Sequence, residues 1–167
     1  MKKHRILLVF AIIVVLLLTY LITRKPSVPI RSVEITQEAT SSAEITRVTY
    51  VVDGDTIDVE GGRRIRYIGI DTPEMTKCFG EAAKEENRRL LDGKTVRLVG
   101  DVSEKDSYGR LLRYVYVGDM FVNDTLVRQG FARAEPVKPD TLFASQFYAA
   151  QTEAKQENRG LWQACQK

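Results

Sequence analysis

The chain has 167 residues, enough for one domain with its own hydrophobic core, and a formal net charge of +3. The first 25 residues carry this positive excess, because residues 26–167 hold 20 basic against 22 acidic residues, which argues against a globally basic protein that coats nucleic acid. The single histidine, His4, lies in the basic leader and excludes histidine catalysis or histidine metal ligation in the rest of the chain.

The N-terminal segment is apolar and flanked by basic residues. Residues 6–22 contain no charge, and as a helix they would span roughly 25 Å, close to the thickness of a bilayer core. Two interpretations compete for residues 1–25, a cleaved signal and an uncleaved membrane anchor. The end of the run lacks the small residues of a cleavage site, which favours the anchor. We therefore expect an exported protein, anchored with its C-terminal part outside, or secreted if the leader is cleaved.

Residues 26–43 have the composition of a flexible linker. They include Pro26 and Pro29 and end in a patch rich in serine, threonine and alanine. The folded domain is then expected over 44–167. It begins with a predicted meander of three strands, whose bounds are 45–52, 57–59 and 64–70 and whose turns are Asp53-Gly54 and Gly61-Gly62.

Further helices and strands follow along the chain. Helices are predicted over 81–91, over 124–129 with Asn123 as the N-terminal cap, and over 141–158 with Gly160 as the stop. Two more strands are predicted over 95–99 and 111–117. Five strands with about three α-helices predict a mainly β fold, a small OB-fold barrel with helices packed against it.

Three carboxylates follow the first strands closely enough to lie at one barrel rim. Asp55 follows the first turn, and Asp71 and Glu74 close the third strand. Carboxylate oxygens with a backbone carbonyl and water suit a hard ion, calcium or magnesium, and the absence of a soft ligand argues against zinc. The alternative is that these residues only stabilise a turn and cap the next segment.

Two arginines accompany the carboxylates. Arg66 lies on the third predicted strand and Arg110 begins the last one. A guanidinium matches a phosphate in shape and carries a permanent charge, so the pair could stabilise a phosphate that gains negative charge as water adds. The alternative for each is a surface ion pair, the expected role of Arg64 and Arg113. Together the carboxylates and arginines predict a metal-dependent site that cleaves phosphodiesters.

The two cysteines, Cys78 and Cys165, have two possible states. Export would place them in an oxidising compartment, where a disulfide between them is favoured, and the bond would connect the chain's C-terminal end to the edge of the predicted site. Two unpaired thiols are the alternative.

Several motifs in this order resemble the staphylococcal nuclease (thermonuclease) family over roughly residues 45–162. They are Asp53-Gly54-Asp55-Thr56, Arg66 with Asp71-Thr72-Pro73-Glu74, Phe79-Gly80-Glu81-Ala82, Asp106-Ser107-Tyr108-Gly109-Arg110, Val122-Asn123 with Leu126-Val127-Arg128-Gln129-Gly130, and Gly160-Leu161-Trp162. The resemblance implies an OB barrel with three helices. It also implies a calcium-dependent nuclease that binds one ion, cuts DNA and RNA, and leaves 3′-phosphates.

The resemblance also implies a role for each matched residue. Asp55, Asp71 and the Thr72 carbonyl correspond to calcium ligands, and Glu74 corresponds to a residue that reaches the ion through water and serves as general base. Arg66 and Arg110 correspond to clamps on the phosphate and the transition state. Tyr108 would lie near the nucleotide. The regions that hold Cys78 and Cys165 lie near each other in the family, which strengthens the case for a disulfide, and a monomer is expected.

One departure from the family pattern concerns the stretch between Glu74 and Phe79. Only Met75-Thr76-Lys77-Cys78 intervene, where other members carry a longer, lysine-rich loop that borders the substrate. The difference bears on substrate affinity and base preference rather than on the chemistry. The alternative function is a non-catalytic OB module that binds nucleic acid or protein at the cell envelope.

Overall fold

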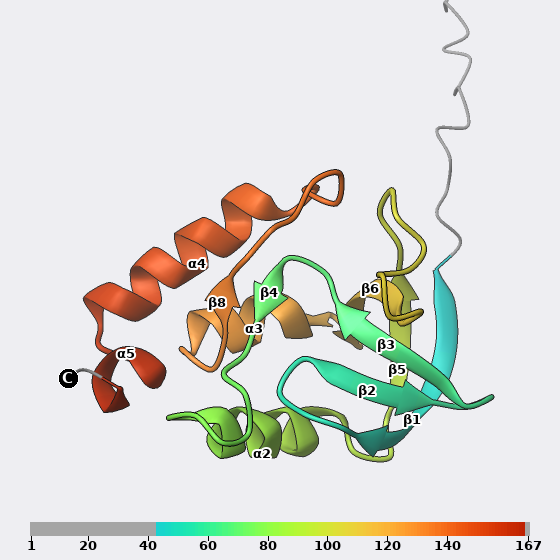
Figure 1. Ribbon diagram of the computed structural model, residues 1–167, viewed down its shortest axis with the longest axis horizontal. Coiled ribbons are helices and arrows are strands. Elements are labelled where there is room, and N and C mark those ends of the chain that lie inside the picture. The colour runs from blue at the N-terminus through green and yellow to red at the C-terminus, as the bar shows by residue number, and fades with distance from the viewer. Residues whose placement is uncertain (1–42, 166–167) are drawn as a thin grey trace, which may run out of the picture. The chain divides into compact units, whose positions relative to one another are not determined.

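The computed structural model describes residues 43–165, which contain a closed β-barrel. Its strands are β1 (Glu44–Val51), β2 (Thr56–Val59), β3 (Arg63–Tyr67), β5 (Thr95–Val99) and β6 (Leu111–Val117). These five strands are joined in antiparallel order, and the parallel pairing of β3 with β6 closes the barrel. The barrel is visible in Figure 1 and confirms the predicted OB-type fold.

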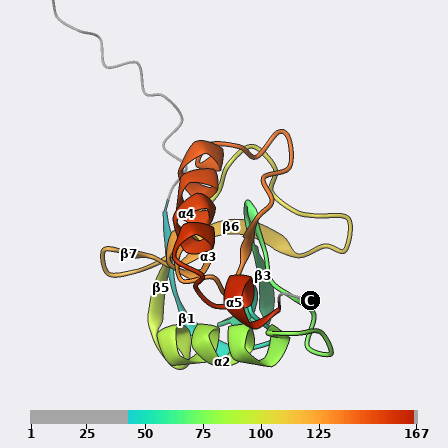
Figure 2. The same ribbon diagram turned by 90° about the vertical axis from the view of Figure 1, so that its left-hand side faces the viewer.

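Within residues 43–165, four helices pack around the barrel. They are α2 (Gly80–Leu91), α3 (Val122–Arg128), α4 (Ala144–Gln156) and α5 (Leu161–Ala164). Figures 1 and 2 show α2 lying across one end of the barrel, while α3 and α4 pack against each other beside it. Three short strands complete the elements: β4 (Ile70–Asp71), β7 (Met120–Phe121) and β8 (Arg133–Ala134).

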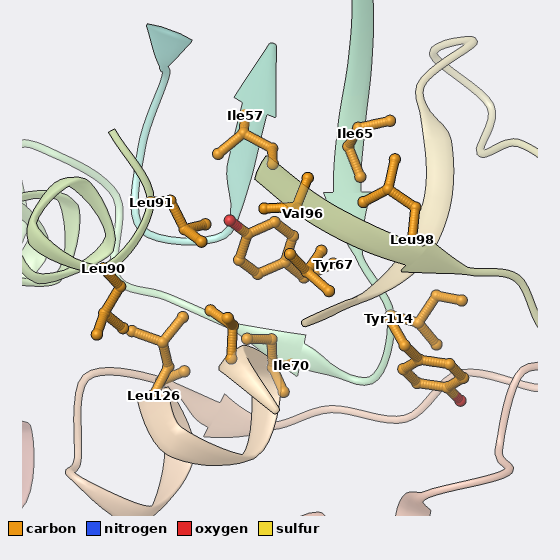
Figure 3. Close-up of a cluster of buried hydrophobic side chains, with 14 of the residues drawn as sticks. Ile57, Ile65, Tyr67, Ile70, Leu90, Leu91, Val96, Leu98, Tyr114 and Leu126 are labelled. Atoms are coloured by element: carbon orange, nitrogen blue, oxygen red, sulfur yellow. The ribbon is translucent and has the colours of Figure 1, made fainter. Parts of the chain in front are cut away.

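A single hydrophobic core joins the barrel to the helices. Strand residues point inward to meet leucines from α2 and α3, as Figure 3 shows. Burial of such side chains is the main favourable contribution to folding. One polar group lies in this core with its partner, since the Tyr67 hydroxyl donates a hydrogen bond to Asn87 Oδ1 of α2 at 2.9 Å.

The third strand ends earlier than its sequence predicts. We expected residues 64–70 to form one strand, but β3 ends at Tyr67 and the chain turns at Gly69 with φ +77°. A Cβ at Gly69 would lie 2.6 Å from the Phe147 ring, so the turn requires glycine for both its backbone angle and its space. Ile70 and Asp71 then form the separate strand β4, which pairs with β8 and carries Asp71 toward the candidate site.

The prediction that Asn123 caps a helix is wrong. The helix α3 already begins at Val122, and Asn123 lies inside it with a fully buried side chain. This side chain accepts a hydrogen bond from the Val115 amide at 3.0 Å and donates one to the Ile68 carbonyl at 2.9 Å. Asn123 therefore connects α3 to β6 and to the end of β3 instead of stabilising the helix start.

The C-terminal helical region differs from its prediction at both ends. The expected helix over 141–158 is shorter, Ala144–Gln156, and Gly160 precedes a further short helix, α5. A disulfide between Cys78 and Cys165 connects the loop before α2 to the residue that follows α5. The C-terminal end of the domain is therefore fixed to the segment that enters α2.

The predicted membrane segment and linker lie in residues 1–42, outside the described part of the chain. Within residues 43–165, none of the helices is both long and apolar enough to cross a bilayer. The expectations for residues 1–25 and 26–43 therefore stay predictions.

Replacing both cysteines with serine should lower the free energy of unfolding by about 4 kcal/mol, because the disulfide closes a loop of 86 residues in the unfolded chain. Urea unfolding of the wild type and of the Cys78→Ser/Cys165→Ser variant measures this loss. A reducing agent should shift the wild type to the variant's midpoint and leave the variant unchanged. A wild-type midpoint that does not respond to reduction contradicts the expectation.

Candidate active site

One small pocket brings together the predicted metal and catalytic residues. Its volume is about 130 Å³, and we call it the acidic pocket. Its lining consists of Asp53, Asp55, Arg66, Asp71, Thr72, Pro73, Glu74 and Arg110. Residues from the first turn, from β3, from β4 with the segment after it, and from the loop just before β6 thus meet at one place, as the sequence pattern predicts.

A tight turn before β2 places Asp55 against Thr72. Asp53 accepts a hydrogen bond from the Asp55 amide through its Oδ1 atom at 3.1 Å, which closes the turn. Gly54, between the two aspartates, packs closely against Thr72, since a Cβ on Gly54 would lie 2.7 Å from the Thr72 side chain. The Asp-Gly-Asp sequence therefore brings two separate segments into direct contact.

The Asp55 carboxylate is buried and fully engaged. Its side chain accepts hydrogen bonds from the Thr72 amide at 2.8 Å, the Thr72 hydroxyl at 3.0 Å and the Thr56 hydroxyl at 3.1 Å. Arg66 Nε lies 3.0 Å from Asp55 Oδ1. Burial raises the pKa of Asp55 to about 6, with Asp53 adding to the rise while Arg66 and Thr72 oppose it.

Arg66 joins the two predicted aspartate ligands. Its guanidinium contacts Asp55 and donates to Asp71 Oδ1 at 3.1 Å. It also donates to the backbone carbonyls of Tyr67 at 2.6 Å and Ile70 at 2.7 Å. Most of its N–H groups are therefore engaged within the protein, and Arg66 holds the turn after β3 in shape while it lines the pocket.

Glu74 differs from the other carboxylates because it is exposed. Its side chain forms no hydrogen bond or ion pair with any residue in 43–165. Its backbone is firmly placed, since the Glu74 carbonyl accepts from the Lys77 amide at 2.8 Å and would lie 2.0 Å from a Cβ at Gly80. The Cys78–Cys165 disulfide also fixes this loop. Glu74 is thus a free carboxylate on a constrained loop.

Arg110 is held from one side and open on the other. Asp106 Oδ2 accepts from Arg110 Nε at 2.6 Å, and Asp106 Oδ1 accepts from the amides of Tyr108 and Arg110 at 2.9 and 3.0 Å. Burial alone would raise the pKa of Asp106, but these hydrogen bonds lower it below its usual value. The Arg110 Nη atoms form no hydrogen bond or ion pair within residues 43–165, which leaves them available to an anion.

The predicted substrate residue Tyr108 lies outside the acidic pocket. Its side chain is 84% exposed, and Arg110 Cζ lies 5.5 Å from the centre of its ring. Tyr108 lines a separate groove beside Arg110. Another hollow, of about 380 Å³, shares Arg66, Asp71 and Arg110 with the acidic pocket and is also lined by Glu135 and Lys138.

Asp53 was predicted as a turn residue, whereas Asp106 and Asn87, which also support the site, were given no role from the sequence. Asp53 shapes the turn, Asp106 aims Arg110, and the buried Asn87 donates to the Asp53 carbonyl at 2.9 Å. Asp106 lies four residues before Arg110 in the motif already noted, and this spacing could have predicted their ion pair. Asn87 lies on α2 and carried no local signal, because its role depends on how α2 packs against the turn.

The two comparison arginines have different roles. Arg64 forms the expected surface ion pair, with Nε 2.7 Å from Asp58 Oδ1. Arg113 also forms an ion pair, with Glu104, but its own side chain is largely buried rather than on the surface and also donates to the Leu112 carbonyl at 2.7 Å. Arg113 lies in the buried middle of β6, and its hydrogen bonds to the Glu104 carbonyl and carboxylate hold the loop before that strand.

The donor set of the acidic pocket suits a hard cation. Its oxygens come from carboxylates and backbone, and no thiol or imidazole lines it. Within residues 43–165, no three acidic, histidine or cysteine side chains are arranged closely enough to hold a metal ion by themselves. An ion held here would therefore need backbone oxygen and water in addition to side chains, and it would compete with Arg66 for Asp55 Oδ1.

Comparisons with known proteins point to one family. Residues 64–164 match the family model described as staphylococcal nuclease homologue. The chain is 37% identical over 125 residues to a thermonuclease of Staphylococcus hyicus, covering 70% of this chain and 74% of that protein. It is 37% identical over 136 residues to a thermonuclease of Staphylococcus intermedius, covering 74% and 81% respectively. It is also 38% identical over 122 residues to endonuclease YncB of Bacillus subtilis, covering 66% and 58%.

The two arginines should respond differently to truncation. Arg66→Ala leaves the buried Asp55 carboxylate without its cation, and we expect it to lower the free energy of unfolding by about 3–5 kcal/mol. Arg110→Ala removes a more exposed pair with Asp106 and should cost less than about 1 kcal/mol. Chemical denaturation of both variants measures the difference. Equal losses would show that Arg66 does not stabilise the turn as described.

Proposed function

The chain belongs to the staphylococcal nuclease family, and we propose, from its similarity to a thermonuclease and an endonuclease, that it is a calcium-dependent endonuclease. In this proposal it hydrolyses the backbones of DNA and RNA and leaves 3′-phosphates. The observation that carries the proposal is the acidic pocket. This pocket of about 130 Å³ is lined by the carboxylate of Glu74, which is unpaired within residues 43–165, by two hydrogen-bonded aspartates, and by the guanidinium of Arg110.

In the proposed site, Asp55, Asp71 and the Thr72 carbonyl would hold one calcium ion. The hard oxygen donors support this assignment. The ion pairs of Asp55 and Asp71 with the same guanidinium, at 3.0 and 3.1 Å, show that the two carboxylates lie close together. When bound, the ion would supply positive charge to a non-bridging oxygen of the phosphate.

Three residues of the chain have separate roles in the proposed reaction. Glu74 has an exposed carboxylate without an internal partner and is the base that accepts a proton from the attacking water. The Arg110 Nη atoms donate to the phosphate, and their contact strengthens as negative charge grows in the transition state. Arg66 contributes the charge of its remaining N–H while it holds Asp55 and Asp71 in place. The water oxygen bonds to phosphorus as the bond from phosphorus to the 5′ oxygen breaks, and the 5′ oxygen takes up a proton from solvent water. The products are a 5′-hydroxyl and a 3′-phosphate.

We further propose that the domain works outside the cytoplasm, either anchored through residues 6–22 or released after cleavage. The Cys78–Cys165 disulfide supports this location, because structural disulfides persist mainly in oxidising compartments. N-terminal sequencing of the native protein separates the two forms. An N-terminus near Met1 supports an anchor, and one after residue 22 supports release.

Calcium removal tests the metal dependence. Digestion of plasmid DNA and of RNA should proceed with calcium, stop with chelator, and resume when calcium is restored. Calcium alone should also raise the thermal unfolding midpoint, because an ion that binds only the folded state stabilises it. Cleavage that continues in chelator contradicts the calcium proposal. Binding without cleavage under all conditions would instead support a non-catalytic OB module.

Glu74→Gln tests the base. We expect kcat to fall by about 10²–10⁴ with little change in KM or stability, because the side chain is exposed and its loss removes only proton transfer. Steady-state cleavage of single-stranded DNA measures the change. Arg89→Ala, a surface ion-pair variant on α2, is the control and should keep wild-type rates. A Glu74→Gln enzyme as fast as this control would remove Glu74 from the mechanism.

A further inference from the structure

A groove beside the acidic pocket has the size and chemistry of a nucleotide site. It measures about 530 Å³, within the range of about 300–1,000 Å³ that is usual for ligand pockets. Its lining consists of Thr49, Tyr50, Asp58, Gly62, Arg64, Tyr108, Gly109 and Arg110. We call it the Tyr50–Tyr108 groove. Arg110 is the residue that it shares with the acidic pocket, so the groove begins where the proposed phosphate contact lies.

Two exposed tyrosines line this groove. Tyr50 on β1 is 57% exposed and Tyr108 in the loop before β6 is 84% exposed. Neither hydroxyl forms a hydrogen bond within residues 43–165, so packing inside the domain does not explain these rings. Each ring lies close to a cation, since Lys84 Nζ is 5.7 Å from the Tyr50 ring centre and Arg110 Cζ is 5.5 Å from that of Tyr108. Aromatic faces next to cations suit bases and their phosphates.

The charges of the groove also favour a nucleotide. Asp58 is its one acidic side chain, and Arg64 neutralises it through two hydrogen bonds of 2.7 and 2.9 Å. The Arg64 side chain stays half exposed, and its planar guanidinium can stack on a base. Asp58 on β2 and Arg64 on β3 face each other across paired strands, and in OB folds the face of the second and third strands binds oligonucleotides.

The position of Arg110 sets the path of a bound strand. It lines three hollows: the acidic pocket, the 380 Å³ hollow with Glu135 and Lys138, and the Tyr50–Tyr108 groove. An endonuclease must accommodate nucleotides on both sides of the phosphate that it cleaves. A phosphate held at Arg110 therefore leaves one flanking nucleotide for the hollow and another for the groove.

We infer that the Tyr50–Tyr108 groove binds a nucleotide next to the scissile phosphate in an unpaired strand, with its base stacked on Tyr50 and Tyr108. The inference rests on the proposed nuclease function and extends it to the form of the substrate. Stacking on a base face requires an unpaired base, so the groove selects single-stranded segments over duplex. The resemblance implied a role for Tyr108, whereas Tyr50 and the groove follow from the structure alone.

Tyr50→Ala and Tyr50→Phe in the full-length protein test the groove. On short single-stranded oligothymidylates, Tyr50→Ala should raise KM about fivefold to 100-fold without lowering kcat, because it removes stacking and leaves the chemistry in place. Tyr50→Phe keeps the ring and should stay within about twofold of wild type. Tyr148→Ala is the matched control, an equally exposed tyrosine on α4 that lines none of these hollows. Cleavage of a duplex of the same sequence should respond little to Tyr50→Ala.

Abasic substrates locate the contact. A single abasic nucleotide next to the cleaved bond, on the side that the groove binds, should raise the KM of the wild type. With this substrate, Tyr50→Ala should raise KM no further, because both changes remove the same stacking contact. The inference is overturned if Tyr50→Ala has the KM of the wild type, or if the variant raises KM equally with every abasic substrate. Failure of the wild type to cleave any oligonucleotide overturns the proposed function instead. Fluorescence anisotropy with labelled oligothymidylate then still tests the groove, and unchanged affinity in Tyr50→Ala rejects it.

Discussion

The contact between the buried carboxylate of Asp55 and the guanidinium of Arg66 organises this site. A carboxylate with 5% exposure is costly unless it is paired and hydrogen-bonded, and here Arg66 and two threonines satisfy it. The same guanidinium holds Asp71 and two backbone carbonyls at the turn after β3. One arginine thus connects the turn before β2 to the end of β4, and the acidic pocket exists because these segments are joined.

The site combines groups that are fixed with groups that are free. Asp55 and Arg66 are engaged on nearly every polar atom, whereas Glu74 and the outer nitrogens of Arg110 have no partner within residues 43–165. The supports of the free groups are rigid, since Asp106 holds Arg110 and the disulfide holds the Glu74 loop. The groups that would contact a substrate are therefore held in place by residues that do not contact it. This arrangement limits the entropy that the site loses when a substrate binds.

The sequence predicts the elements with strong local signals and misses those that depend on packing. Strands β5 and β6 have their predicted bounds, because β-branched and aromatic residues alternate there between clear turns. The break at Gly69 was missed, since only the Phe147 ring packed against it reveals why the strand ends. Asn123 has the residue type of a cap, yet its amide forms hydrogen bonds with β6 and with the turn after β3. The pocket residues were predicted as a group because they lie in ordered motifs, and Asp53 and Asp106 act on neighbours within the same motifs. Asn87 could not be predicted, because it acts through a tertiary contact.

Charge pairing explains how a domain without excess positive charge could attract a polyanion. Residues 26–167 are slightly acidic, and many arginines are neutralised locally, as in the pairs Arg63–Glu44, Arg88–Glu85 and Arg128–Asp124. Such pairs contribute little long-range field. The outward side of Arg110 is an exception, and it lies where the three hollows meet, with Lys138 lining one hollow and Lys84 beside the ring of Tyr50. Attraction is then confined to the strand segment that crosses Arg110, and stacking rather than net charge must supply much of the remaining affinity.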